Sequence, residues 1–143
     1  MDTIQEYSGF RVLGGQDGFA TQKIAYPLEY FSQRECVLDC RSPGAIEIED
    51  GAHIGWFVRF ICVSHNVGQN RFGELITRRV VVRKGAFVAA YATLYNCEIG
   101  EGSVVALGAV VRSMSVEPWT MVEGNPARPF RRRRKDGTWE KIA

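Results

Sequence analysis

The sequence lacks the features that would place the chain in a membrane or in an export pathway. None of its apolar runs approaches the ~20 consecutive residues that a membrane-spanning helix needs. Its first ten residues, MDTIQEYSGF, have neither the basic nor the apolar region of a secretory signal. We therefore expect a cytoplasmic protein that has no membrane partner.

Cysteine and histidine are also scarce, with four copies and two copies in 143 residues. Four cysteines could form two disulfides, but nothing points to an oxidising compartment. Cys36 and Cys40 are interpreted as inward-facing core residues, because a buried cysteine behaves as a small hydrophobe. A zinc site would need Cys or His at ligand spacing, and Cys62 and Cys97 stand alone. No metal site is predicted.

Charge is nearly balanced, at a formal net charge of +2, but it is unevenly placed. From Arg128 onward seven Lys or Arg stand against two acids, whereas residues 1–127 hold eleven against fourteen. Clustered arginines bind phosphates well, and a solvated tail is the alternative. Nucleic acid is not expected as a partner, because the body is acidic and no aromatic residues alternate with the arginines.

What the chain does have is a ladder of apolar residues spaced six apart. Its members are Ile48, Ile54, Phe60, Val82, Val88, Leu94, Ile99, Val105 and Val111. A strand repeats every two residues and a helix every 3.6, so a period of six describes a chain that turns a corner after each short strand. This pattern is typical of a mostly-β protein built as a β-helix.

The ladder also suggests how a single domain is organised. Three six-residue faces close a triangular coil of roughly eighteen residues, so about four coils fit between residues 36 and 127. Residues 1–35 show no such phase and are expected to cap the open end of the coils. Residues 128–143 form the basic tail.

Two breaks interrupt the six-residue phase. The first follows Ser64, and the polar segment after it has to leave the body of the helix, because its backbone groups could not be satisfied inside. Residues 66–79 are therefore expected to form a protruding loop. The second break separates Leu94 from Ile99, which are five apart, and predicts one shortened corner at residues 95–97.

Residues 46–134 closely resemble the last coils and C-terminal signature of hexapeptide-repeat O-acetyltransferases, especially their sugar and xenobiotic branch. The motif EGNPAR at 123–128 is the most specific part of the match. The resemblance implies a left-handed parallel β-helix, an exception to the usual right-handed crossover rule. It also implies a homotrimer with active sites between subunits, and acetyl-CoA as donor and co-substrate.

The same resemblance identifies a general base. In that family the catalytic histidine lies where the coil breaks into the loop, and Ser64-His65-Asn66 stands at that place. Asn66 replaces a common acidic residue and bears on how His65 is oriented. Imidazole suits the role because it titrates near neutral pH, although the residues alone leave a structural role for His65 open. The other histidine, His53, lies in the segment DGAHIGW and is interpreted as an exposed corner residue.

Small residues mark the coenzyme path that the resemblance implies. The corner Phe87-Val88-Ala89-Ala90 would supply a backbone N–H for the oxyanion, at Ala90, and let the pantetheine arm lie flat along the coil. Ala106-Leu107-Gly108 matches the next corner along that path. Corner packing is the alternative, and both roles are compatible.

Three arginines are assigned to the coenzyme on the same grounds. Arg112, followed by Ser113, stands where many members of the family have Thr-Lys beside the coenzyme. Arg128 and Arg131 are expected to pair with its phosphates.

The predicted reaction is direct transfer of an acetyl group from acetyl-CoA to a hydroxyl of a sugar or other small acceptor. Such transfer needs a base, oxyanion donors and a surface that aligns both reactants. A γ-type carbonic anhydrase would need three histidines for its zinc, and the chain has two. A β-helix scaffold or binding module without catalysis is the alternative. The identity of the acceptor is left open.

Overall fold

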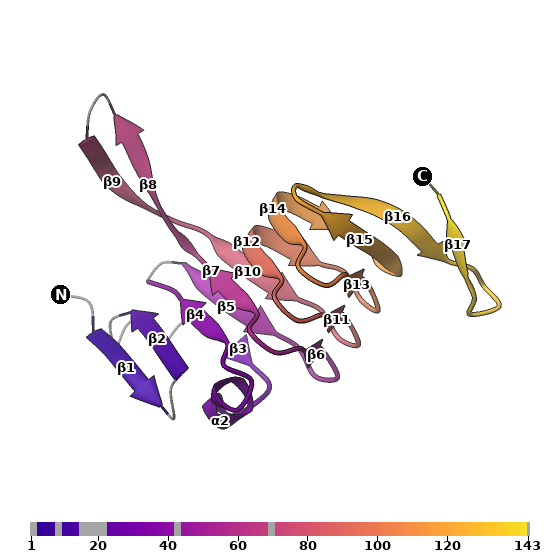
Figure 1. Cartoon of the computed structure of the whole chain (residues 1–143), viewed down its shortest axis with the longest axis horizontal. Coiled ribbons are helices and arrows are strands. Elements are labelled where there is room, and N and C mark those ends of the chain that lie inside the picture. Colours follow the sequence, from indigo (N-terminus) through magenta and orange to yellow (C-terminus); the bar gives the residue numbers. More distant parts are fainter. Residues whose placement is uncertain (1–2, 8–9, 15–22, 42–43, 69–70, 143) are drawn as a thin grey trace.

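The computed structural model describes residues 3–7, 10–14, 23–41, 44–68 and 71–142. The chain winds into a left-handed parallel β-helix of short strands, as Figure 1 shows. The predicted fold class is confirmed. Each strand pairs in parallel with the strand of the same face in the next coil. The coils therefore stack at the ordinary distance between hydrogen-bonded strands.

Three sheet faces run along the helix. The first contains β3 (Lys23–Ile24), β5 (Ala45–Ile48), β10 (Arg79–Val82) and the second halves of β12 (Thr93–Ile99) and β14 (Val110–Val116). The second contains β6 (His53–Ile54), β11 (Phe87–Val88), β13 (Val104–Val105) and β15 (Thr120–Gly124). The third contains β2 (Phe10–Gly14), β4 (Val37–Asp39), β7 (Arg59–Ile61) and the first halves of β12 and β14.

The faces meet at three rows of corners. The first corner joins the first and second faces, the second corner joins the second and third, and the third corner leads from the third face to the next coil. β12 and β14 run through the third corner without interruption, so their two halves belong to different faces.

The coils after the arm are 17 residues long, one fewer than predicted, whereas the coil that carries the arm separates Ile48 from Val82 by 34 residues. Val82 pairs with Ile99, and Ile99 pairs with Val116, a spacing of 17 in each case. The missing residue lies at the third corner, where Asn96 and Ser113 adopt φ values of 45° and 49°. The shortened corner predicted at 95–97 is confirmed, and Ser113 repeats it one coil later.

The ladder residues form the core, and each of the nine exposes 1% or less of its surface. All four cysteines are buried free thiols, as expected for Cys36 and Cys40. Burial raises the pKa of Cys36 to about 11 and that of Cys97 to about 12, so both stay protonated at neutral pH. They act as small hydrophobic residues.

A short helix, α2 (Leu28–Ser32), lies at the N-terminal end of the coils in Figure 1. Its residue Phe31 is buried and meets Phe60 edge to face, with ring centroids 6.0 Å apart. The hydroxyl oxygen of Tyr30 accepts a hydrogen bond from the backbone N–H of Ile54 at 3.0 Å. Among the described residues no strand pairs with the outer edge of β6, and α2 satisfies part of that edge, which is the task of a cap.

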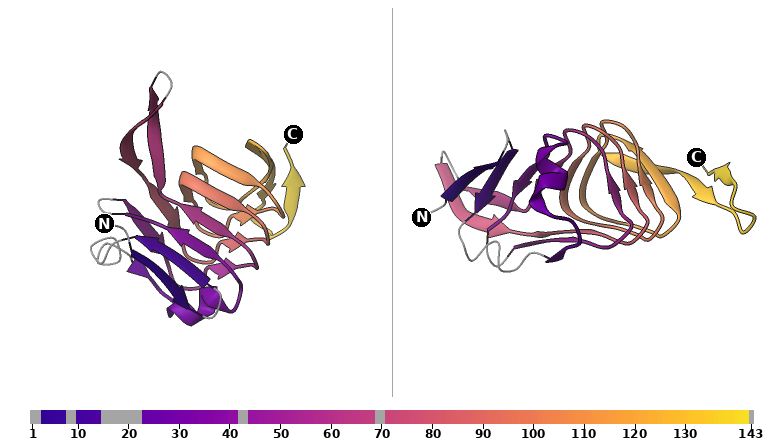
Figure 2. Two further views of the ribbon diagram at one scale, coloured as in Figure 1. Left: turned by 60° about the vertical axis from the view of Figure 1, so that its left-hand side comes forward. Right: turned by 90° about the horizontal axis from the view of Figure 1, so that it is seen from below.

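Further strands extend the molecule at both ends. β1 (Thr3–Tyr7) pairs antiparallel with β2, which continues the third face. At the other end β15 pairs antiparallel with β16 (Ala127–Arg133), and β16 with β17 (Trp139–Lys141). The basic tail is therefore an ordered strand pair that projects beyond the coils, as the right-hand view of Figure 2 shows.

One segment leaves the body at the third corner, which we call the arm. It consists of β8 (Val63–Gly68) and β9 (Arg71–Thr77), an antiparallel hairpin that stands away from the coils in Figures 1 and 2. The protruding segment was expected as a loop over residues 66–79. It begins earlier and is paired, because hairpin hydrogen bonds satisfy backbone groups that an irregular loop leaves to water.

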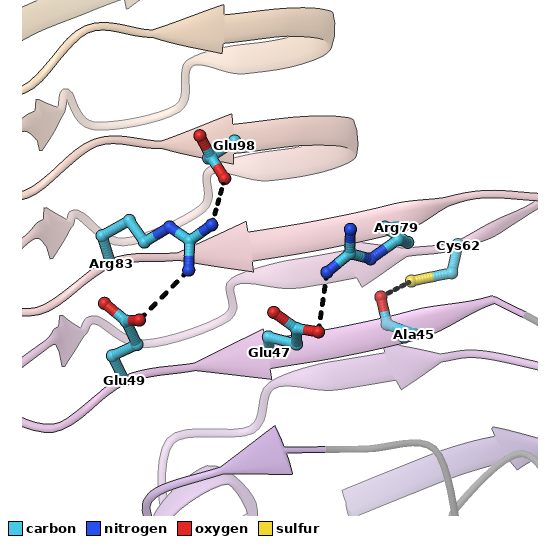
Figure 3. Close-up of polar contacts among 7 residues, drawn as sticks. All are labelled: Ala45, Glu47, Glu49, Cys62, Arg79, Arg83 and Glu98. Atoms are coloured by element: carbon cyan, nitrogen blue, oxygen red, sulfur yellow. Dashed lines mark hydrogen bonds and ion pairs between the residues drawn. The ribbon is translucent and has the colours of Figure 1, made fainter.

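Charged pairs connect neighbouring coils on the outer side of the first face (Figure 3). Arg79 pairs with Glu47 at 2.7 Å, and Arg83 bridges Glu49 and Glu98. The backbone N–H of Lys84 donates to Glu49 and is the main reason that the pKa of this carboxyl is lowered. Because these groups are partly exposed, each pair contributes little stability alone.

Across the described residues, the structure contains no helix with the length and apolarity needed to cross a membrane.

Candidate functional site

His65 lies on β8, near the root of the arm. It is exposed and pairs across the hairpin with Leu75. The strand register shifts between His65 and Val67, so Asn66 sits in a β-bulge. A bulge re-aims side chains and is common beside active sites. The two predicted catalytic residues are thus neighbours on an exposed, irregular part of the arm.

A glycine on the opposite strand shapes this bulge. A Cβ built at Gly73 would lie 2.6 Å from the carbonyl oxygen of Asn66, a distance that no real side chain tolerates. The backbones of β8 and β9 therefore approach closely only because position 73 is glycine. In the sequence, a glycine inside a strand is the feature that indicates such a close approach of two backbones.

Five of the nine predicted coenzyme residues lie at the second corner, which comprises residues 55–58, 89–92 and 106–109: Ala89, Ala90, Ala106, Leu107 and Gly108. Phe87, predicted as part of this corner, lies instead on β11. The N–H of Ala89 donates to the carbonyl of Val105, and the N–H of Gly108 donates to the carbonyl of Ala90. Within the described part of the chain, no group accepts a hydrogen bond from the N–H of Ala90. An N–H without a protein acceptor is what the oxyanion role requires.

A pocket of about 640 Å³ lies where the second corner meets the C-terminal strands. Its lining residues are Ala106, Leu107, Glu123, Gly124, Arg128, Pro129 and Phe130. Three of the predicted coenzyme residues, Ala106, Leu107 and Arg128, therefore lie together. They come from two segments, the second corner and the EGNPAR motif.

The other predicted arginines lie outside this pocket. Arg112 is exposed on the third face, beside the shortened corner at Ser113. Arg131 lies on β16 with its guanidinium 5.7 Å from the ring centroid of Phe130, which lines the pocket. Arg131 is thus close to the predicted phosphate site, whereas Arg112 belongs to a different surface.

The rest of the arginine run turns toward the first corner. Arg133 stacks over the ring of Trp119 at 4.5 Å, and both line a pocket of about 370 Å³ with Arg134 and Lys135. Arg134 also pairs with Glu140 at 3.0 Å. The basic tail is therefore divided between two corners of the β-helix.

The two halves of the predicted site do not meet within one chain. His65 follows the third face and leaves on the arm, whereas Ala90 lies at the second corner. The arm is inserted between β7, the last strand of the preceding coil, and β10, the first strand of the coil that carries Ala90.

His53 is exposed, as predicted, but it lies on β6 and not in a turn. Its ring stacks on that of Phe87, with centroids 5.1 Å apart and 5° between the planes. One face of the predicted coenzyme residue Phe87 is therefore covered. The two residues are in register in adjacent coils, which the 34-residue spacing of the ladder implies.

Sequence reasoning missed three aromatic residues at the second corner, Trp56, Phe57 and Tyr91. Phe57 and Tyr91 have φ values of 61° and 64°, and Gly108 occupies the equivalent position of the next coil at 69°. The register of β6, β11 and β13 aligns the three positions. Aligning the coils by their period would have revealed aromatic side chains in a position that favours glycine.

A groove of about 530 Å³ lies along the first face beside the third corner, the corner that carries the arm. Polar side chains dominate its lining: Arg79, Val81, Asn96, Cys97, Glu98, Ser113, Met114 and Ser115. The amide of Asn96 donates to the hydroxyl of Ser113 at 3.2 Å. Within the described residues, no group of three or more His, Cys, Asp or Glu is arranged to hold a metal ion.

Comparison of the sequence with models of known protein families and with curated proteins gives no match. Three solved structures illustrate what the fold is similar to. A maltose O-acetyltransferase from Clostridium difficile 630 is 20% identical over 87% of this chain and 59% of its own, with a TM-score of 0.61. A hexapeptide-repeat acetyltransferase from Vibrio cholerae, complexed with acetyl coenzyme A, is 23% identical over 78% and 60%, with a TM-score of 0.54.

The third is an N-acyltransferase from Bacillus cereus in complex with dTDP and 3-hydroxybutyryl-CoA. It is 20% identical over 89% of this chain and 65% of its own, with a TM-score of 0.62. At these identities the likeness concerns the fold, and it agrees with the predicted left-handed β-helix. The chain spans about three fifths of the length of these three proteins.

Proposed function

We propose that the chain is an O-acyltransferase that moves the acetyl group of acetyl-CoA to a hydroxyl of a small acceptor. One observation carries the proposal. The unpaired N–H of Ala90 and the pocket that holds Arg128 lie on the same row of corners, one coil apart at Ala106-Leu107. A donor for an oxyanion and a cation for phosphate are thereby arranged along one path.

The second corner fits an extended thioester. Ala89, Ala90 and Ala106 have short side chains, so a pantetheine arm can approach the backbone closely. Arg128 is exposed in the pocket and offers its charge to phosphate at one end of the path. At the other end the N–H of Ala90 would hydrogen-bond the thioester carbonyl oxygen and stabilise the charge that develops there.

His65 acts as the general base in this proposal. It takes the proton of the acceptor hydroxyl while that oxygen attacks the thioester carbonyl carbon. The C–S bond then breaks, the sulfur leaves with the electron pair, and the proton passes to it to give free thiol. Asn66, in the adjoining bulge, supplies an amide that positions the imidazole or the acceptor.

We propose a homotrimer as the active form. The three-fold axis would run parallel to the axis of the β-helix. The arm of one copy would then lie at the height of Ala90 in the next copy. Val67 and Leu75 on the arm are 72% and 38% exposed and provide apolar surface for that contact. The polar groove beside Asn96 and Ser113 supports a hydroxylated acceptor.

A thiol-release assay tests the proposed function. Acetyl-CoA is offered with a panel of sugars and hydroxylated antibiotics, and release above the no-acceptor rate is expected for one acceptor class. Light scattering on the same sample is expected to give three times the 16.0 kDa chain mass. A monomer at micromolar concentration, or no binding of acetyl-CoA, would contradict the proposal.

Arg128→Ala is expected to weaken acetyl-CoA binding about tenfold, which corresponds to ~1.4 kcal/mol and suits a partly solvated charge-assisted contact. The loss should be smaller for dephospho-CoA thioester, which lacks the 3′-phosphate, if that phosphate is the partner. Calorimetry with both donors measures it, and added salt should shrink the difference.

The matched control is Arg134→Ala. This arginine pairs with Glu140 and lines the other pocket of the tail. Its removal should change the affinity for either donor by less than about twofold, as expected for a contact outside the path. Equal losses for the two variants would indicate general attraction by the basic tail and no specific phosphate site at Arg128.

A further inference from the structure

Trp56, Phe57 and Tyr91 form a continuous apolar surface at the second corner, which we call the aromatic ridge. The rings of Phe57 and Tyr91 stack, with centroids 4.8 Å apart and 18° between the planes. The ring of Trp56 lies 6.1 Å from that of Phe57 at a tilt of 52°. Trp56 and Tyr91 are 52% and 54% exposed. The ridge is therefore open to solvent although its rings already support each other.

Two residues of the aromatic ridge have an unfavourable backbone conformation. Phe57 and Tyr91 occupy the left-handed region, which bulky side chains rarely adopt. Gly108 fills the equivalent position of the next coil without such strain. The N–H of Tyr91 donates to the carbonyl of Trp56 at 2.9 Å and ties the two coils together. Strain of this kind persists where the surroundings over-determine it, and it concentrates at ligand sites.

The aromatic ridge lies on the same row of corners as the proposed binding path of the donor, one coil further toward the N-terminus. Register aligns Trp56, Ala90 and Leu107 in three successive coils. Arg128 lies beyond Leu107, toward the C-terminus. If the phosphates lie at Arg128 and the thioester carbonyl at Ala90, the part of the donor that continues past Ala90 is its acyl group. The next coil in that direction carries Trp56 and Phe57.

The size of the ridge exceeds what an acetyl group can cover. A methyl group beside Ala90 would contact one ring edge at most, whereas three aromatic side chains offer a surface that runs across two coils. Laying methylenes on such a surface removes apolar area from water, which favours a longer chain by up to about fourfold per fully buried methylene. The ridge is thus suited to a chain of several carbons.

We propose that the aromatic ridge binds the acyl chain of thioester donors longer than acetyl. This inference rests on the proposed function, because the direction of the donor is taken from it. The transfer step is unchanged: the carbonyl carbon passes from sulfur to the acceptor oxygen. The ridge sets which acyl groups are held, and Ala90 and Arg128 hold the rest of the donor.

Calorimetry on the full-length protein tests the inference with four probes: coenzyme A, acetyl-CoA, butyryl-CoA and hexanoyl-CoA. Hexanoyl-CoA has four more methylenes than acetyl-CoA, and about half-burial of each predicts affinity higher by about tenfold. Trp56→Ala and Tyr91→Gly should reduce this preference to within about twofold while leaving acetyl-CoA binding nearly unchanged. Tyr91→Gly also relieves the positive φ, so loss of folding would not explain its effect.

The control variant is Ile142→Ala, which removes an apolar side chain of similar exposure, 40%, from the terminal strand pair. It should keep the full chain-length preference. Equal affinity of the native protein for all thioesters would overturn the inference and leave the proposed function intact. If none of the four probes bound, both would fall. If Trp56→Ala dissociated the oligomer in light scattering, the ridge would be a subunit contact, and the inference would be wrong.

Discussion

Replacement of His65 by alanine is expected to lower turnover with acetyl-CoA by roughly 10²–10⁴, the range typical for loss of a general base. The imidazole is exposed on β8, so its removal opens no cavity in the core. Affinity for acetyl-CoA should be unchanged, because the second corner of the same chain is untouched. Thiol release and calorimetry on the same preparation separate the two effects.

The control is His53→Ala, which should leave turnover nearly unchanged. His53 stacks on Phe87 from the exposed side of β6 and lies on a face that carries no part of the arm. If the His53 variant lost activity and the His65 variant kept it, the base would be His53 and the arm would have another role.

Mixing two weakened variants tests whether His65 acts across a subunit boundary. His65→Ala chains keep an intact second corner, and Arg128→Ala chains keep an intact arm. In the proposed homotrimer, mixed assemblies would contain some interfaces that combine both intact halves. At low acetyl-CoA these mixtures should recover activity that neither variant shows alone. Mixed trimers without recovery would place His65 in the site of its own chain.

The core could be predicted from the sequence because one repeating pattern determines it. A six-residue apolar period is compatible with a chain that turns after each strand and with neither a helix nor a long strand. Each ladder residue then points inward regardless of what its neighbours are. The five-residue spacing of Leu94 and Ile99 also predicted the shortened corner at 95–97, but not that Ser113 repeats it one coil later.

The strand pairing in the arm and in the tail could not be predicted from the sequence. The polar stretch after Ser64 predicts that the chain leaves the body, but pairing of β8 with β9 depends on the bulge at Asn66 and the glycine opposite it. In the tail, β16 returns antiparallel along β15, and a register irregularity lies between Met121 and Val122. This return sends Arg128 and the later arginines to different corners, which no charge count predicts.

At the candidate site, sequence motifs predicted the small residues of the coenzyme path, and the structure shows which groups lie around them. Ala90 was predicted as a donor through a family resemblance, and the structure adds that no described group accepts a hydrogen bond from its N–H. Trp56 and Tyr91 were missed because an aromatic residue outside the six-residue phase looks like ordinary packing in a sequence. Their exposure and positive φ at Tyr91 are properties of the folded corner.

Phe60→Ala is expected to reduce the free energy of unfolding by about 3–5 kcal/mol, the usual cost of replacing a buried phenylalanine by alanine. Phe60 is fully buried, and its ring meets Phe31 of α2 at 88°. Leu38 and Leu94 lie in register on either side. The cavity would open at the junction between cap and coils, where β4 and β12 are paired with β7 on either side and resist collapse into it.

Urea denaturation measures this loss at one fixed protein concentration, since the proposed assembly would make stability depend on concentration. Leu107→Ala is the matched control: this side chain is 72% exposed, and the change should be within about 0.5 kcal/mol. Phe60→Leu should recover much of the loss because it refills most of the volume.

Hydrogen exchange should show α2 losing protection before the inner coils, since its main contact with the core is gone. A loss below about 1 kcal/mol, or uniform loss of protection, would mean that α2 does not depend on Phe60 to cap the β-helix.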